Sequence, residues 1–403
     1  MVQGGGRRER WGGFARGKRL TPDARRLVAV QGTRALAYGL GSVLIGVTLA
    51  ERGYSDAAVG VILASLLAGN ALASVLLARH ADRFGRRRSY RVLLVLMACA
   101  GAVFALTGSL PALIAAGLTG TLSTDVVESG PFTSLEQAML PHASGDRDPT
   151  RLFGTYNTVA TLAGSFGALI ALVGSTPSLL LAYPLAAVLG LAISAGLSSA
   201  VEVGHELEAE DHAPPHRSRG VVARMCGFFA LDSFGGGFVP LTFIAYLFTR
   251  RYDASPETLA VLFFAIGLIQ AVSFQVAVRV AGRIGLLRTM VFTHLPSNIL
   301  LVAVAFAPNL ETAIALLVGR FALSQMDVPT RQAYVVGVVE PTERTAAAAY
   351  TNVARTLARP VSPVLAGTAL RLGLGAPFLI AGALKSAYDV GFYLAFRKVP
   401  LRF

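Results

Sequence analysis

Residues 78–88 read ARHADRFGRRR, which places five arginines and an aspartate between two apolar runs, 57–78 and 89–109. Each run is as long as the ~20 apolar residues that an α-helix needs to cross ~30 Å of hydrocarbon. Gly85 permits a tight turn between the two runs, because it has no Cβ to clash. We therefore predict two membrane-spanning helices joined by a tight, basic turn.

The whole chain has the composition of a membrane protein. Of its 403 residues, 54% are hydrophobic and 15% are charged, with a mean hydropathy of +0.58. A soluble domain carries ~25% charged residues, so these values exclude a disordered protein, a collagen-like fibre and an ordinary cytosolic enzyme. We predict an all-α polytopic membrane protein with twelve transmembrane helices, at approximately 27–50, 57–78, 89–109, 111–141, 151–174, 178–200, 221–249, 257–280, 288–307, 310–339, 345–371 and 375–396.

Arginine and lysine are distributed unevenly between the two sides of the predicted membrane. One side receives the basic tail before residue 26, the 78–88 stretch and the basic C-terminal end. Since loops rich in arginine and lysine stay in the cytoplasm, both termini are predicted to be cytoplasmic, in a plasma or inner cell membrane. The net charge of +13 thus reflects topology and indicates no nucleic-acid partner. The opposite side receives Arg52, Arg250, Arg251 and Arg371.

The two halves of the chain resemble each other. Residues 81–85 match 281–285 at an offset of 200, Pro131 matches Pro329 at 198, and Asn157 matches Asn352 at 195. Parallel repeats of this kind occur in transporters that bind substrate between two halves near the midplane. The predicted organisation is a cytoplasmic tail (1–26), a six-helix bundle (27–200), a cytoplasmic linker (201–220), a second six-helix bundle (221–397) and a C-terminal tail (398–403).

The 78–88 stretch resembles the signature loop of the major facilitator superfamily, G-x-x-x-D-R-x-G-R-R, with Ala78 in place of the leading glycine. Together with the spans and the long linker, the resemblance covers almost the whole chain. It implies the twelve-span fold of that superfamily, with two pseudo-symmetric six-helix bundles. It also implies that the loop latches the cytoplasmic side in one alternating-access state; the alternative is a purely topogenic arginine cluster. The latch residues would be Asp82, Arg83, Gly85, Arg86 and Arg87.

Charged residues inside the predicted spans are the candidate functional residues. Each costs roughly 2.5–3.5 kcal/mol at the bilayer centre on insertion scales, so its presence needs a reason. Six bases (Arg34, Arg320, Arg331, Arg355, Arg359, Lys385) balance six acids (Asp125, Glu128, Glu136, Asp232, Asp327, Asp389). We predict that the substrate and proton path is formed by Arg34, Asp125, Glu128, Asp232, Asp327 and Arg355.

Several pairings are expected within this set. Arg34 corresponds to Asp232 at the repeat offset, so we expect the two to interact across the pseudo-two-fold axis. Proton binding to Glu128 or Asp327 would weaken such pairs and favour the opposite-facing state. Helix breaks beside these residues would suit a substrate site or a moving gate; we expect them at Gly130, Pro131, Pro329 and Pro360.

Other charges are interpreted as structural. Lys385 and Asp389 are spaced i, i+4 in the last span and are expected to pair with each other. Glu136 and Arg331 are expected near the cytoplasmic ends, where they would meet the signature loop. His294 is interpreted as a satisfied polar residue rather than a proton relay.

The sequence predicts a proton-coupled secondary active transporter of a small organic solute. The direction of transport is not decided by the sequence, and export is one option. Residues 163–167 lack the glycine–proline pair of the superfamily's drug–proton antiporters, and span four lacks their arginine. The alternative is a membrane-embedded lipid-handling protein or enzyme; no clustered nucleophile or metal motif supports it, so we predict no enzyme activity and no cofactor. The linker histidines are interpreted as solvated, Cys99 and Cys226 as unpaired, and the protein as a monomer.

Overall fold

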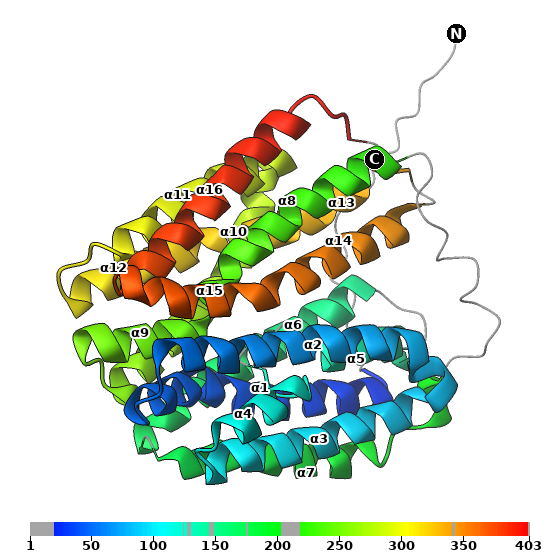
Figure 1. Ribbon diagram of the computed structural model, residues 1–403. Helices are drawn as coiled ribbons and strands as arrows, with labels where there is room; N and C mark the ends of the chain where they lie inside the picture. The colour runs from blue at the N-terminus through cyan, green and yellow to red at the C-terminus, as the bar shows by residue number, and fades with distance from the viewer. Residues whose placement is uncertain are drawn as a thin grey trace.

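The computed structural model describes residues 20–401 apart from 124, 127–129, 145–148, 175, 203–217 and 341–342, and describes the backbone alone at 78, 79, 82, 141–144, 149–154, 336, 344 and 345. These residues form helices and connecting turns, with no β-strand among them (Figure 1). The helices are α1 (Pro22–Glu51), α2 (Asp56–Phe84), α3 (Arg86–Leu106), α4 (Leu110–Leu118), α5 (Pro131–Ser144), α6 (Pro149–Leu169), α7 (Ala182–Ser194), α8 (Arg219–Gly237), α9 (Leu241–Tyr252), α10 (Pro256–Ile284), α11 (Leu286–Val304), α12 (Leu310–Ser324), α13 (Asp327–Gly337), α14 (Arg344–Ala358), α15 (Ser362–Ala369) and α16 (Ala376–Phe396).

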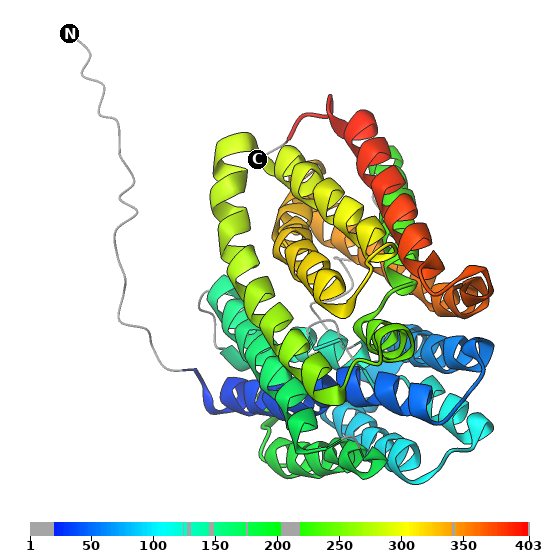
Figure 2. The same ribbon diagram turned by 90° about the vertical axis from the view of Figure 1, so that its left-hand side faces the viewer.

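The helices lie in two groups. In Figure 1 the first group, α1–α7, occupies the lower part of the view, and most of the second group, α8–α16, lies above it; the turned view in Figure 2 shows the same division. Within the first group α1 packs on α6 and α7, and within the second α11 packs on α12 and α16. The most extensive contacts between the groups are those of α1 with α9, α2 with α15, and α6 with α10. The all-α fold predicted from the sequence is confirmed.

The internal repeat is visible in the way helices begin and end. Ser55 caps α2 by accepting a hydrogen bond from the Ala58 amide, and Ser255, 200 residues later, caps α10 in the same way. The two helices end at Gly85 and Gly285, whose φ angles are 91° and 87°. These positive values require glycine at the turn, so the same cap and the same turn recur at the repeat offset.

Four of the predicted spans are broken. The 221–249 span divides into α8 and α9, with Pro240 directly before the first residue of α9. The 111–141 span divides into α4 and α5, with Pro131 as the first residue of α5 and Gly130 before it at a φ of 63°. The 310–339 span divides into α12 and α13, with Pro329 in the first turn of α13. Between α14 and α15 a short 3₁₀ turn, Arg359–Val361, contains Pro360. In each case the proline stands where a helix begins or is interrupted, because its missing N–H costs least there.

Eight stretches of the described chain are helices long and apolar enough to cross a membrane, judged by length and composition. The predicted spans 111–141, 310–339 and 345–371 are not among them, because the α-helices within these spans are 15 residues long or shorter. The predicted span 375–396 corresponds to α16, which carries Lys385 and Asp389 and is not among the eight either. The count of twelve spans therefore stays a prediction.

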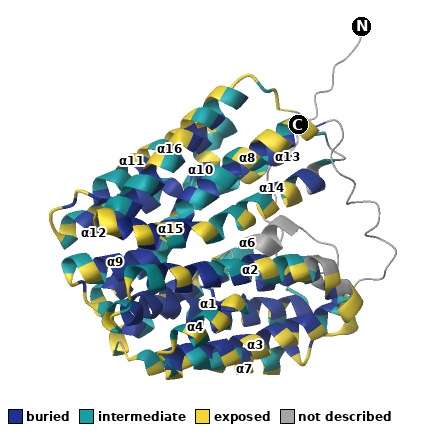
Figure 3. Cartoon of the chain, viewed as in Figure 1, coloured by how far each residue is buried: buried dark blue, intermediate teal, exposed yellow. Residues whose placement is uncertain are grey.

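Apolar side chains face outward as well as inward. Figure 3 shows buried residues along the inner faces of the helices and exposed ones along the outer faces. On α7, Leu185 is 62% exposed and Val188 57%; on α10, Val272 is 63% exposed and Val278 64%. Rows of exposed branched side chains on neighbouring turns would be unfavourable in water and are suited to contact with lipid.

Candidate functional site

Two adjoining cavities lie between the two groups of helices. The larger has a volume of about 1310 Å³ and the smaller a volume of about 270 Å³. Both are lined from the first and the second group, so a solute bound in them would touch both. The residues that line both cavities are Asp125, Thr161, Ser233, Pro240, Phe274, Val328, Arg355 and Arg359.

The larger cavity extends toward one end of the molecule. We call this the terminal end, because α1 begins and α16 ends there; the opposite end is the far end (Figure 1). The lining of the larger cavity follows α2 from Leu66 through Asn70 to Val75, toward the terminal end of the molecule. It also follows α14 from Leu357 back to Tyr350, in the same direction. The two groups are thus separated by open space in the terminal half of the molecule.

At the far end the two groups are in close contact. Asp56 of α2 accepts hydrogen bonds from the Tyr246 hydroxyl at 2.5 Å and from Arg250 Nη1 at 3.3 Å, both on α9. The backbones of α2 and α15 touch: a Cβ added to Gly60 would lie 2.5 Å from the Pro363 carbonyl oxygen, and one added to Gly367 would lie 2.4 Å from the Asp56 carbonyl oxygen. The described conformation is therefore closed at the far end and open toward the terminal end.

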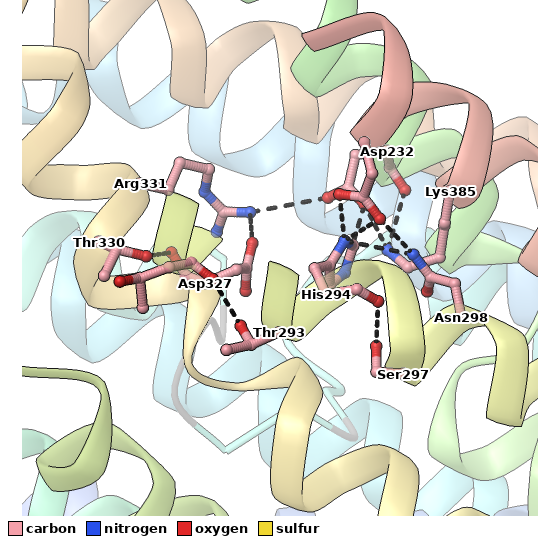
Figure 4. A network of polar contacts seen from close by, with 11 residues as sticks. Asp232, Thr293, His294, Ser297, Asn298, Asp327, Thr330, Arg331 and Lys385 are labelled. Atoms are coloured by element: carbon pink, nitrogen blue, oxygen red, sulfur yellow. Dashed lines mark hydrogen bonds and ion pairs between the residues drawn. The ribbon is translucent and has the colours of Figure 1, made fainter. Parts of the chain in front are cut away.

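A network of buried charges lines the smaller cavity (Figure 4). Asp232 of α8 is 4% exposed and accepts a charged hydrogen bond from Lys385 Nζ on α16. Arg331 of α13 places Nη1 3.6 Å from Asp232 Oδ2 and 2.9 Å from Asp327 Oδ2. One carboxylate thereby joins α8, α13 and α16.

His294 of α11 extends this network to another carboxylate. Its Nδ1 lies 2.9 Å from Asp389 Oδ1, and its Nε2 lies 3.9 Å from Asp232 Oδ1. Asn298 Nδ2 donates to Asp389 Oδ2 at 2.8 Å. We call the group of titratable residues the Asp232 cluster: Asp232, His294, Asp327, Arg331, Lys385 and Asp389.

The Asp232 cluster contains three carboxylates, two permanent cations and one histidine. The Arg320 guanidinium, which lines the same cavity, also interacts electrostatically with Asp232 and Asp327. All six side chains of the cluster are buried, so its charges interact in a medium of low dielectric constant.

Four of the six predicted path residues line the cavities. Asp125, Asp232, Asp327 and Arg355 line one or both cavities. Asp125 pairs with Arg359 of the second group, at 3.6 Å between Oδ2 and Nη1. Glu128 lies outside the described residues, as do the linker histidines in 203–217.

Arg34 is placed elsewhere, and the expected Arg34–Asp232 contact is wrong. Arg34 lies 2.6 Å from Glu136 of α5, and both side chains are 0% exposed. The hydroxyls of Tyr90 and Tyr156 also donate to Glu136. Glu136 is within reach of Arg34 because α5 packs on α1. Arg34 is not among the residues that line the cavities.

Two further expected pairings are also wrong. Lys385 pairs with Asp232 rather than with Asp389, because α8 and α11 each pack on α16 and present different partners to its successive turns. Arg331 is 5% exposed and belongs to the Asp232 cluster rather than to a contact with the signature loop. His294 is satisfied, as expected, but its partners are two carboxylates.

The signature loop at the terminal end contacts its own group. Glu202 accepts hydrogen bonds from the backbone amides of Arg86 at 2.7 Å and Arg87 at 3.2 Å, and from Arg87 Nε at 3.1 Å. Glu202 thus caps the start of α3, where Gly85 offers no side chain. Partial burial alone would raise the pKa of Glu202, but these hydrogen bonds lower it below its ordinary value. Arg83 is exposed, and at Asp82 the backbone alone is described.

Sequence reasoning missed part of the site. The path predicted from the sequence omits His294, Arg320 and Lys385, which line the smaller cavity, and Asp389, which contacts His294. The signal for His294, Lys385 and Asp389 was present: polar residues on α11 and α16 share a helix face at matching depth. Which helix each face meets depends on tertiary packing, and this information is absent from the spacing.

Comparisons with known proteins agree with this architecture. A family model described as Major Facilitator Superfamily matches residues 27–323. A Saccharomyces cerevisiae protein described as uncharacterized membrane protein YJR124C is 26% identical over 425 residues, covering 94% of each chain. The nucleoside transporter NupG has a TM-score of 0.71 at 13% identity, covering 93% of this chain and 98% of its own. A D-xylose–proton symporter has a TM-score of 0.68 at 17% identity, covering 94% and 98%.

The match to the family model and the likeness in fold point the same way. The family model spans well over half of the chain, and the solved structures cover more than nine-tenths of it. At these identities the structures show a shared fold and say nothing of this chain's substrate. The chain belongs to the Major Facilitator Superfamily and has the multi-pass fold of its membrane transporters.

Proposed function

We propose that this chain is a proton-coupled secondary active transporter of a small organic solute, and that it works by alternating access. The family and the structural neighbours point to a transporter rather than an enzyme. One of these neighbours is described as a proton symporter. The observation that carries the proposal for this chain is the Asp232 cluster, which is buried, titratable and open to the smaller cavity.

The coupling step we propose is protonation of His294. In the neutral state Nε2 is available to accept a proton beside Asp232, while Nδ1 faces Asp389. Once protonated, His294 competes with Lys385 and Arg331 for the Asp232 carboxylate, which loosens the contacts that join α8 to α13 and α16. Proton binding thereby changes the relative stability of two arrangements of the second group.

The conformational change we propose moves two bundles, 27–200 and 221–397, against each other, with 201–220 as the linker. Closing the terminal end would bring the signature loop toward the second bundle, where its latch residues would exchange their present contacts for new ones. Asp125, Asp232, Asp327 and Arg355 would then line the path between the bundles. We further propose that both termini are cytoplasmic in the cell membrane and that the transporter is a monomer.

The proposal is tested in proteoliposomes loaded with a solute library. Accumulation of a solute should depend on an imposed pH gradient and should vanish when an ionophore dissipates it. His294→Gln should abolish pH-driven accumulation and retain downhill exchange, because the path is kept and the proton carrier is lost. The matched control is His80→Gln. This histidine is exposed, and its contact in the described structure is with the Leu76 carbonyl oxygen rather than with a carboxylate. Accumulation that persists without the pH gradient would refute proton coupling.

A further inference from the structure

We infer that Arg320 and Ser324 of α12 form an anion-binding site in the smaller cavity, and that the transported solute is an organic anion bearing a carboxylate or phosphate group. The inference rests on the proposed function, because it names the class of solute that the cavity takes. Three observations support it: unpaired buried donors, the charge of the lining, and the shape of the space.

The first observation is a set of buried donors without acceptors. Arg320 is 8% exposed, and its Nε and Nη1 atoms have no hydrogen-bond partner among the described residues. Ser324, one helical turn further along, is 5% exposed and its Oγ is likewise without a partner there. A buried donor left without an acceptor is costly, and a buried guanidinium especially so. Both side chains line the smaller cavity, so an acceptor in that space would satisfy them.

The second observation is the charge balance of the two cavities. The described lining carries five permanent cations and three carboxylates. Asp125 pairs with Arg359, Asp232 with Lys385, and Asp327 with Arg331. Arg320 stands outside these three pairs, so an anionic solute would complement it better than a neutral or cationic one. The five cations are Arg320, Arg331, Arg355, Arg359 and Lys385.

The third observation is the geometry of Arg320. Its guanidinium carbon lies 4.5 Å from the centroid of the Phe321 ring, so the planar group is held beside the ring. A fixed guanidinium presents two parallel N–H groups that match the two oxygens of a carboxylate or a phosphate. Ser324 Oγ adds a donor at i+4 on the same face.

The space around this site limits the rest of the solute. The smaller cavity, of about 270 Å³, is also lined by Phe263, Ile266 and Phe321, and it joins the larger cavity of about 1310 Å³. An anionic group at Arg320 would therefore be accompanied by a compact and partly apolar body. This describes a small organic acid or a phosphate ester rather than an inorganic ion.

The test uses matched compounds on the purified full chain. Each carbon skeleton is offered as a carboxylate, as the corresponding primary amide and as the corresponding amine, with phenyl phosphate added beside benzoate, benzamide and benzylamine. Binding is read by thermal shift at pH 7 and then titrated by calorimetry in detergent. We expect the compounds that bind to be carboxylates or phosphates.

Variants assign the binding to the site. Arg320→Gln should weaken binding of the anion about 10- to 100-fold, because a charge-assisted pair of hydrogen bonds is lost. Arg320→Lys and Ser324→Ala should each weaken it about 3- to 10-fold, and they carry the test if Arg320→Gln does not fold. Arg224→Gln, at an exposed arginine outside both cavities, is the matched control and should bind as the wild type does.

The outcomes separate this inference from the proposed function. The inference is overturned if amides or amines bind as tightly as the anions, if no anion binds, or if Arg320→Gln, Arg320→Lys and Ser324→Ala all bind the anion as the wild type does. A neutral or cationic solute that accumulates under a pH gradient overturns the inference and supports the transport function. Anion binding that depends on Arg320, without any pH-driven accumulation, supports the inference and overturns proton coupling.

Discussion

Adding a single methyl group where α2 meets α15 should shift the protein away from the conformation described above. A Cβ on Gly60 would lie 2.5 Å from the Pro363 carbonyl oxygen and 3.3 Å from the Gly367 Cα. A Cβ on Gly367 would lie 2.4 Å from the Asp56 carbonyl oxygen. In both cases the obstructing atoms belong to backbone, which cannot rotate away as a side chain can. The two helices must therefore separate to accommodate either alanine.

The size of the effect follows from the cost of overpacking. Inserting a methyl group into a well-packed contact costs typically 1–3 kcal/mol, which is a factor of about 5 to 150 in an equilibrium constant at 1.4 kcal/mol per tenfold. The far-end contact exists in the described conformation and is broken when the far end opens, so this cost falls on one state. Two transporter states that differ by a few kcal/mol would exchange their populations.

The measurement is a distance between spin labels across the far end. After replacement of the two native cysteines, labels at Ser109→Cys and Glu311→Cys sit at exposed positions of the first and second groups. Gly60→Ala should move the distance distribution toward longer values in lipid nanodiscs. Gly227→Ala is the control, because a Cβ there meets nothing within 4 Å. If Gly60→Ala is folded and gives the same distribution as Gly227→Ala, the reasoning is refuted.

Two further predictions concern stability. Glu136→Gln leaves the Arg34 guanidinium buried without its carboxylate and should lower the free energy of unfolding by about 3–5 kcal/mol. The double variant Arg34→Met, Glu136→Leu removes both charges and should recover much of that loss. Denaturant titration in detergent measures both variants, and an equal loss of stability in the two would contradict the pairing. The folded-state pKa of Glu202 lies below its ordinary value of 4.5, so its stabilising effect is present above that pH and is lost as the pH falls through the folded-state pKa. The wild type should thus exceed Glu202→Gln in free energy of unfolding by at most about 1 kcal/mol at pH 7, because the side chain is 28% exposed. The difference should shrink as the pH is lowered below 4.5; a difference that grows on acidification would contradict the capping role.

The membrane class and the internal repeat could be read from the sequence because both depend on local pattern. Long apolar runs predict helices wherever they occur, and Gly85 and Gly285 mark equivalent turns whatever surrounds them. The residues at which the predicted spans are interrupted could be located less accurately than the spans themselves. Pro131, Pro329 and Pro360 each marked a break, but the residues where a helix stops before the proline are set by packing.

The pairing of charges could not be read from the sequence, because repeat offset and helical spacing do not determine which side chains meet. Arg34 and Asp232 occupy equivalent positions in the two halves, yet each finds a nearer partner within its own group. Lys385 and Asp389 have the spacing of a helical ion pair, yet each is engaged by a different neighbouring helix. Pairing over a distance is decided by which helices are adjacent.

The Arg34–Glu136 pair and the Asp232 cluster are both buried groups of charged side chains, but they differ in their access to a cavity. Glu136 receives Arg34 and two tyrosine hydroxyls, so the carboxylate is saturated with donors, and the pair is sealed at 0% exposure. Neither Arg34 nor Glu136 lines the two cavities, so a solute bound there does not touch the pair. Asp232 and His294 line a cavity, so a ligand in that cavity can reach their cluster. Under the proposed function, the cluster that borders a cavity is the one that can respond to a ligand, which would concentrate the transport chemistry in the second group.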